Sequence, residues 1–143
     1  MRLHETRLID RSLEEVFAFT ADFSNAESWD PGVAKADQVE GAGPGVGARY
    51  ELMVTFGLAT IPMTYETTVY EPDSRVVLEG RGENIGALDD IRFEAQDGKT
   101  LVDYTADLSF GNWMRFASPL LAPILGKLVG EKALDGLVEA LER

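Results

Sequence analysis

Two tyrosines, Tyr65 and Tyr104, are the side chains of this sequence best suited to proton transfer inside an apolar site. Each lies in a stretch where apolar and polar residues alternate, on the apolar side of the alternation. General acid–base catalysis needs a titratable group whose pKa burial moves toward neutrality. On the same alternation Glu51, Glu66 and Asp103 fall on the polar face. The sequence therefore offers Tyr65 and Tyr104 as catalytic candidates, with hardly any carboxylate beside them.

Other chemically useful residues lack the partners that their chemistry needs. The chain has no cysteine and one histidine, His4, which excludes disulfides, zinc–thiolate sites and a histidine-rich metal centre. We expect His4 to be a surface residue without a catalytic triad. Asp89 and Asp90 do not fit the EF-hand pattern, and we expect them on a solvated acidic strand edge. The glycines within 41–47 match no phosphate-binding motif and predict a plain loop. No metal or cofactor is expected.

The charge balance bears on partners and location. With 25 acidic and 13 basic residues the formal net charge is -12, which repels nucleic acid and anionic membranes at long range. The most apolar stretch, 116–130, contains Lys127 and is shorter than the ~20 residues that cross a bilayer, so no stable membrane insertion is expected. The first residues contain no apolar signal region, which makes a cytoplasmic location the default. Monomer and homodimer both stay open.

Two capping signals predict two short helices near the N-terminus. A first strand is expected over 2–10, where polar and apolar residues alternate. A Ser-x-x-Glu capping box at Ser12 then begins a helix over about 12–20. A second box at Ser24 begins another, and Pro31 followed by glycine ends it within a turn or two.

The remainder predicts a sheet and one long helix in a single domain over 1–143. Residues 33–109 alternate with a period of two between turn-forming segments, which with the first strand gives about seven antiparallel strands. Such a sheet has one wet face and one covered face. Apolar residues at spacings of three and four predict a covering helix over about 119–142, with Pro119 and Pro123 near its start.

Four segments resemble a known family in order and spacing: IDRSLEEVFAFTADFSNAESWDPGV, GPGVGARYEL, YETTVYEPDSRVVLEG and TLVDYTADLSF. They are similar to the START-like polyketide cyclase/dehydrase and lipid-transport superfamily (SRPBCC), also described as Bet v 1-like. The resemblance implies an α+β helix-grip fold, a seven-stranded antiparallel sheet wrapped around a long C-terminal helix, with two short helices after the first strand. It also implies a cavity between sheet and helix that opens near the short helices.

The cavity lining follows from this topology and the alternation. We expect Phe17, Phe19, Phe23 and Trp29 to close one end of it. Tyr and Trp have polar tips that a partly wet pocket can satisfy, although an ordinary packed core also uses aromatics. The predicted ligand-binding residues are Trp29, Leu52, Val54, Tyr65, Thr67, Leu78, Phe93, Tyr104, Ala106, Leu108, Trp113, Phe116, Leu120 and Ile124.

Three functions are compatible with these observations. The first is binding or transport of a hydrophobic small molecule, lipid or polyketide-like, inside the cavity. The second is an enzyme of the polyketide aromatase/cyclase kind, with Tyr65 or Tyr104 as proton donor. The third is a protein-interaction module that uses the apolar stretch from Trp113 to Leu128 as its contact face. Small residues such as Ala106, Gly126 and Gly130 would leave volume in the interior and favour the first function, although Gly126 and Gly130 are equally compatible with close packing of the helix on the sheet.

Overall fold

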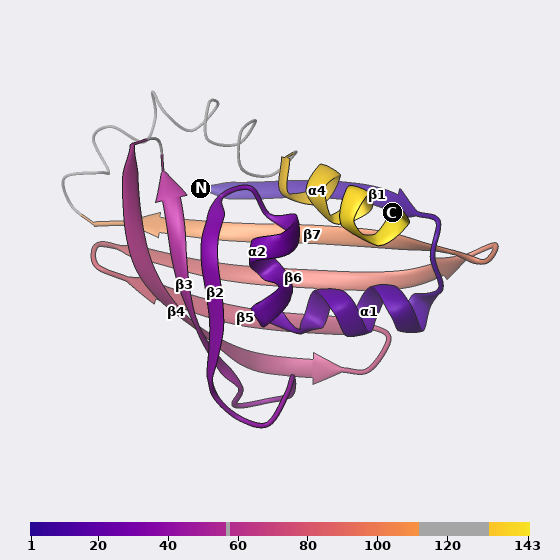
Figure 1. Cartoon of the computed structure of the whole chain (residues 1–143), viewed down its shortest axis with the longest axis horizontal. Helices are drawn as coiled ribbons and strands as arrows, with labels where there is room; N and C mark the ends of the chain where they lie inside the picture. The colour runs from indigo at the N-terminus through magenta and orange to yellow at the C-terminus, as the bar shows by residue number, and fades with distance from the viewer. Residues whose placement is uncertain (57, 112–131) are drawn as a thin grey trace.

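The computed structural model describes residues 1–56, 58–111 and 132–143. Within them, seven strands form one antiparallel sheet in the order β1-β7-β6-β5-β4-β3-β2 (Figure 1). The strands are β1 (Arg2–Ile9), β2 (Val33–Glu40), β3 (Arg49–Phe56), β4 (Ala59–Glu71), β5 (Arg75–Gly82), β6 (Ile85–Gln96) and β7 (Lys99–Phe110). The helical elements are α1 (Leu13–Ala21), the 3-10 turn η1 (Phe23–Asn25), α2 (Ala26–Trp29) and α4 (Lys132–Glu142). The predicted fold class is confirmed.

The helices cover one face of the curved sheet. Helix α1 contacts β6 and β7, α2 contacts β2, and α4 contacts both β1 and α2, so elements from the two ends of the chain close over the same surface (Figure 1). The buried core lies between these helices and the sheet. The alternation in the strands places their apolar residues on one face of the sheet, and that face must be covered by other elements.

The period-two pattern correctly predicted the buried side of β3, β6 and β7, and of β4 as far as Thr67. Tyr50 and Leu52 on β3 are buried, whereas Arg49 and Glu51 between them are exposed. Arg92 on β6 is exposed as well. Shifts of register occur in β2 and in β4 between Thr67 and Val69, and none of them reverses the side of the sheet to which the predicted inward tyrosines belong.

One helix cap was predicted correctly and one was not. The backbone N–H of Glu15 donates to the Ser12 side chain at 3.3 Å, which caps α1 as expected. Ser24 caps nothing. Instead Ser24 lies inside the 3-10 turn η1, where Asp22 is the N-cap and accepts from the Ser24 backbone N–H at 3.1 Å and from its hydroxyl at 2.6 Å.

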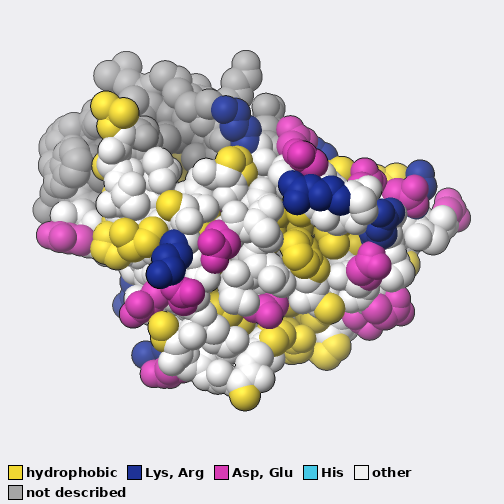
Figure 2. Space-filling view, in the orientation of Figure 1, with side chains coloured by type: hydrophobic (Ala, Val, Ile, Leu, Met, Phe, Trp, Pro, Cys, Tyr) yellow, Lys and Arg dark blue, Asp and Glu magenta, His cyan; other side chains and the backbone are white. Residues whose placement is uncertain are grey.

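Charged side chains lie mostly outside this core. On the face shown in Figure 2, Lys and Arg side chains lie close to Asp and Glu, and no large continuous basic patch is visible among the described residues. Arg7 is an example, with Glu5 at 3.1 Å and Asp135 of α4 at 3.0 Å. None of the helices in the described ranges is both long and apolar enough to span a bilayer.

Helix α4 represents the described part of the predicted C-terminal helix, and positions 119–131 of that prediction lie outside the described residues. Leu134, Leu137 and Leu141 are buried against the core. Gly136 lies against the end of α2, where an added Cβ would overlap the Trp29 carbonyl oxygen. The absence of a side chain at Gly136 therefore allows α4 to approach α2 closely.

We predict that Gly136→Ala destabilises the protein by about 1–3 kcal/mol, because the methyl group would overpack against backbone. The sign of the change in the free energy of unfolding is informative, because Gly→Ala inside a helix ordinarily stabilises a protein by up to about 1 kcal/mol. Thermal or urea unfolding measures the change. The control is Glu139→Ala on the exposed side of α4, which should stay within about 0.5 kcal/mol of the wild type. An increase in stability for Gly136→Ala would contradict the contact.

Candidate functional site

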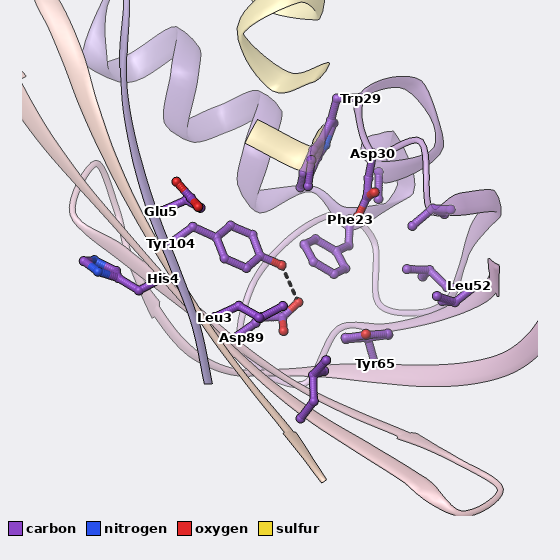
Figure 3. A pocket seen from close by; sticks show the side chains of 16 residues that line it. Leu3, His4, Glu5, Phe23, Trp29, Asp30, Leu52, Tyr65, Asp89 and Tyr104 are labelled. Carbon is purple, nitrogen blue, oxygen red and sulfur yellow. Dashed lines mark hydrogen bonds between the residues drawn. The ribbon is translucent and has the colours of Figure 1, made fainter. Parts of the chain in front are cut away.

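A pocket lies under α2 and α4 on the covered face of the sheet (Figure 3). Strands β1, β3, β4, β6 and β7 supply its floor and walls, residues 23–33 supply one rim, and Ala133 of α4 also lines it. Its volume is about 70 Å³, whereas pockets that enclose a drug-sized ligand measure roughly 300–1,000 Å³. The pocket bounded by the described residues therefore fits a group of a few heavy atoms, not a whole acyl chain.

The structure brings together half of the residues predicted to bind a ligand. Those that line the pocket are Trp29, Leu52, Val54, Tyr65, Tyr104, Ala106 and Leu108. Thr67, Leu78 and Phe93 are buried elsewhere in the core, because their strands run past the pocket beneath α1. Trp113, Phe116, Leu120 and Ile124, together with Gly126 and Gly130, lie outside the described residues. A role in binding stays a prediction for all of them.

Two of the four N-terminal aromatics line the pocket. Phe23 and Trp29 are buried beside it, with ring centroids 6.3 Å apart in an edge-to-face contact. Phe17 instead packs against Tyr70 at 5.3 Å and Phe93 at 5.1 Å, and Phe19 is partly buried against the core. The expectation that all four close the cavity was wrong for these two, since neither lines the pocket.

Asp89 is the unexpected member of the site. Its side chain is only 5% exposed, lines the pocket, and accepts a hydrogen bond from the Tyr104 hydroxyl to Oδ2 at 2.6 Å (Figure 3). The expectation of a solvated acidic edge was therefore wrong for Asp89. The alternation of β6 gives the reason, because Asp89 shares the inward side of the strand with Ala87 and Ile91. The alternation of inward and outward residues, which is visible in the sequence, was therefore sufficient to predict that Asp89 points inward.

Burial raises the pKa of the Asp89 carboxyl to about 7, and the nearby charge of Asp30 adds to the rise, while the Tyr104 hydrogen bond opposes it. Asp30 lies directly after α2 and also lines the pocket. Burial raises its pKa to about 6, against the effect of the Gly32 N–H, which donates to its Oδ1 at 2.8 Å. Asp30 was missed because nothing in its local sequence indicates that the turn after α2 points inward.

The two predicted tyrosines both reach the pocket. Burial raises the pKa of the Tyr65 and Tyr104 hydroxyls well above the usual range, so both stay protonated at neutral pH and can donate hydrogen bonds. The Tyr65 ring lies over Gly80, where an added Cβ would come within 2.6 Å of ring carbons. Gly80 therefore leaves the space that Tyr65 occupies on the sheet.

One further polar atom at the pocket has no partner. Trp29 is 3% exposed, and its Nε1 finds no hydrogen-bond acceptor among the described residues. Leaving a buried donor unpaired costs about 1–3 kcal/mol. His4, by contrast, points away from the pocket and contacts Asp103 at 2.7 Å on the surface, as predicted (Figure 3). No cluster of three or more metal-ligating side chains occurs in the described ranges.

Residues 1–142 match the family described as polyketide cyclase/dehydrase and lipid transport. The chain belongs to this family. No curated protein matches the sequence at a significant level.

Solved structures of the family's fold resemble the chain over nearly its whole length. The protein TTHA0849 from Thermus thermophilus is 17% identical, with a TM-score of 0.82 over 99% of this chain and 97% of that one. The Zhui aromatase/cyclase from a Streptomyces species is 15% identical, with a TM-score of 0.82 over 100% and 94%. Ara h 8.0201 is 15% identical, with a TM-score of 0.67 over 99% and 95%. At these identities the likeness establishes the Bet v 1-like helix-grip fold.

The raised pKa of Asp89 predicts an unusual dependence of stability on pH. A carboxyl with a higher pKa in the folded state than in the unfolded state destabilises the fold as pH rises from about 4 to above 7. A rise from 3.8 to about 7 corresponds to roughly 4 kcal/mol, at about 1.4 kcal/mol per pKa unit. We therefore expect Asp89→Asn to be more stable than the wild type at about pH 8, with the difference vanishing near pH 4. Urea unfolding across this range measures it.

The neighbouring Asp90 provides a matched control of opposite sign. Arg75 donates two hydrogen bonds of 3.0 Å to the Asp90 carboxylate, which lowers the pKa of Asp90. Its stabilising effect is present at neutral pH and is lost as pH falls through that lowered pKa. Asp90→Asn should therefore be less stable than the wild type at neutral pH. If both variants change stability in the same direction at about pH 8, the burial assigned to Asp89 is incorrect.

Proposed function

We propose that the protein binds a small hydrophobic molecule, lipid or polyketide-like, whose polar end reaches Asp89 and Tyr104 in the pocket. The observation that carries this proposal is an apolar pocket holding polar atoms that the described part of the fold leaves unsatisfied. Tyr104 donates to Asp89 Oδ2, and among the described residues it is the donor found for this carboxylate, which leaves Oδ1 open. Trp29 Nε1 likewise has no acceptor in the described ranges. Such atoms are costly unless something completes their hydrogen bonds.

The size of the pocket limits what it can enclose. About 70 Å³ is several times the ~10–15 Å³ that one water needs on this measure, so the polar end and the first few carbons of a ligand fit. The walls there are apolar residues such as Leu52, Val54 and Ala106. Burial of the apolar part would supply affinity at roughly 25 cal/mol per Å², before ordering costs are subtracted.

Hexan-1-ol is a suitable neutral probe, and the indole N–H of Trp29 is a suitable reporter because it lies at the pocket. In a ¹H–¹⁵N spectrum we expect hexan-1-ol to shift the Trp29 indole signal in a saturable way. The chain has two tryptophans, and Trp113→Phe assigns the two indole signals.

The matched variants enlarge one alanine each. Ala106→Leu adds volume at the pocket wall, where Ala106 is buried, and should abolish the shift, whereas Ala34→Leu on the exposed side of β2 should preserve it. The smaller step Ala106→Val serves if the leucine variant does not fold. An unchanged Trp29 signal at saturating hexan-1-ol, or an undiminished shift in a folded Ala106 variant, would refute binding in this pocket.

A second function, an enzyme of the polyketide cyclase/dehydrase kind, is favoured by the position of Asp89 at the pocket, hydrogen-bonded to Tyr104. Burial there raises the pKa of Asp89 to about 7, where a general base works best. In a dehydration, the Asp89 carboxylate would accept the proton from the carbon next to a substrate carbonyl. As the acid it would return that proton to the departing hydroxyl, which leaves as water. The Tyr104 hydroxyl positions Asp89 for this step.

A 3-hydroxyacyl thioester tests the enzymatic alternative. If Asp89 is the base, water loss from the thioester should accelerate as pH rises through about 7, and Asp89→Asn should reduce kcat by about 10²–10⁴-fold. Asp90→Asn should leave kcat unchanged. Formation of the unsaturated thioester is followed by its ultraviolet absorption. Turnover that survives in Asp89→Asn would remove this residue from the mechanism.

A further inference from the structure

The pocket contains more negative charge than the described residues compensate. Three carboxyl groups line it, those of Glu5, Asp30 and Asp89. Glu5 is paired with Arg7, whose Nη1 lies 3.1 Å from Glu5 Oε2. Neither Asp30 nor Asp89 has a basic side chain within ion-pair distance in the part of the chain that the structure describes. Asp89 is buried and Asp30 is half-buried, and an uncompensated buried charge is expensive.

Aromatic rings surround the same space. Phe23, Trp29, Tyr65 and Tyr104 all line the pocket, and the Phe23 ring lies 5.4 Å from that of Tyr65 and 6.3 Å from that of Trp29. Figure 3 shows these rings on several sides of the cavity, with the carboxylate of Asp89 among them. Aromatic faces attract cations through the negative potential of the ring.

We propose that the bound molecule is an amphiphilic amine, and that its ammonium group contacts Asp89 Oδ1, with Asp30 and the aromatic rings completing the site. This inference rests on the proposed function and specifies the chemical class of its ligand. Tyr104 holds Asp89 Oδ2 at 2.6 Å, which fixes the carboxylate and leaves Oδ1 for the incoming donor. An ammonium group has three donors and is small enough for the roughly 70 Å³ of the pocket.

Charge distinguishes this ligand from the alternatives. A cation compensates Asp30 and Asp89 together, and its charge-assisted hydrogen bonds are roughly twice as strong as neutral ones. An alcohol of equal length gains the same apolar burial but adds no positive charge beside the two carboxylates. A fatty acid brings a further negative charge beside the buried Asp89 and the half-buried Asp30, which is unfavourable in a low-dielectric site.

The protonation state of the site sets the pH dependence. Among the residues that the structure describes, the titratable groups that face Asp89 are Asp30 after α2, Tyr65 of β4 and Tyr104 of β7, while Glu5 of β1 lies across the pocket with its own partner Arg7. Both tyrosines stay neutral, so the two aspartates govern the charge. Amine binding should therefore weaken as pH falls below about 7, where the aspartates gain protons. It should weaken again as pH rises through ~10.4, the usual pKa of a lysine ammonium group, because the amine then loses its charge.

Three probes with one chain length test the proposal: hexylamine, hexan-1-ol and hexanoate. Each is titrated at about pH 8 in roughly 0.15 M salt, which screens the general attraction of amines to an acidic surface. The readouts are the Trp29 indole signal and calorimetry. We expect hexylamine to bind at least about tenfold more tightly than hexan-1-ol, a difference that one charge-assisted contact supplies, and hexanoate to bind most weakly.

Two substitutions test whether Asp89 is the residue that makes the pocket prefer an amine. Asp89→Asn keeps the size of the side chain and should bring hexylamine down to the affinity of hexan-1-ol, while Asp90→Asn removes the same charge from the neighbouring position and should retain the amine preference. Hexylamine that binds no more tightly than hexan-1-ol in the wild type overturns the inference but leaves the proposed function intact. If no probe shifts the Trp29 signal, both fail. An amine preference that persists in Asp89→Asn also overturns the assignment to Asp89.

Discussion

The close packing of α4 against the end of α2 is the contact on which the site depends. A curved sheet with one apolar face needs a cover, and here two elements from opposite ends of the chain meet to form it. Gly136 lets α4 approach the Trp29 carbonyl. This contact fixes the end of α2, so Trp29 and the following Asp30 are held over the pocket.

The floor of the site follows from strand geometry. Successive residues of a strand point to opposite faces, so Asp89 and Asp90 enter different environments although they are adjacent. Asp90 faces Arg75 and its pKa is lowered, whereas Asp89 faces the apolar pocket and its pKa is raised to about 7. The same backbone thus produces an ordinary surface ion pair and an unusual buried acid.

The sequence predicted the elements better than the site. Alternation and the Ser12 cap are local signals, and they sufficed for the sheet, the first helix and the inward side of Tyr65 and Tyr104. Asp89 has the same parity as Ile91, yet its charge suggested a solvated position, because carboxylates are rarely buried. Asp30 had no local signal at all, since its place depends on the α2–α4 contact between residues far apart in the chain.

Asp89 carries a cost that the fold itself does not require. Ionising it inside the pocket opposes folding at neutral pH, and an apolar side chain at this inward position would avoid that cost. Costs of this kind mark functional sites. The two roles considered for Asp89 make opposite demands on it: a general base must take up a proton during the reaction, whereas a carboxylate that binds a cation must stay ionised while the ligand is present. A bound ammonium lowers the pKa of Asp89, so an amine would act as a competitor of any proton transfer at this residue and would restore the stability that the buried charge removes.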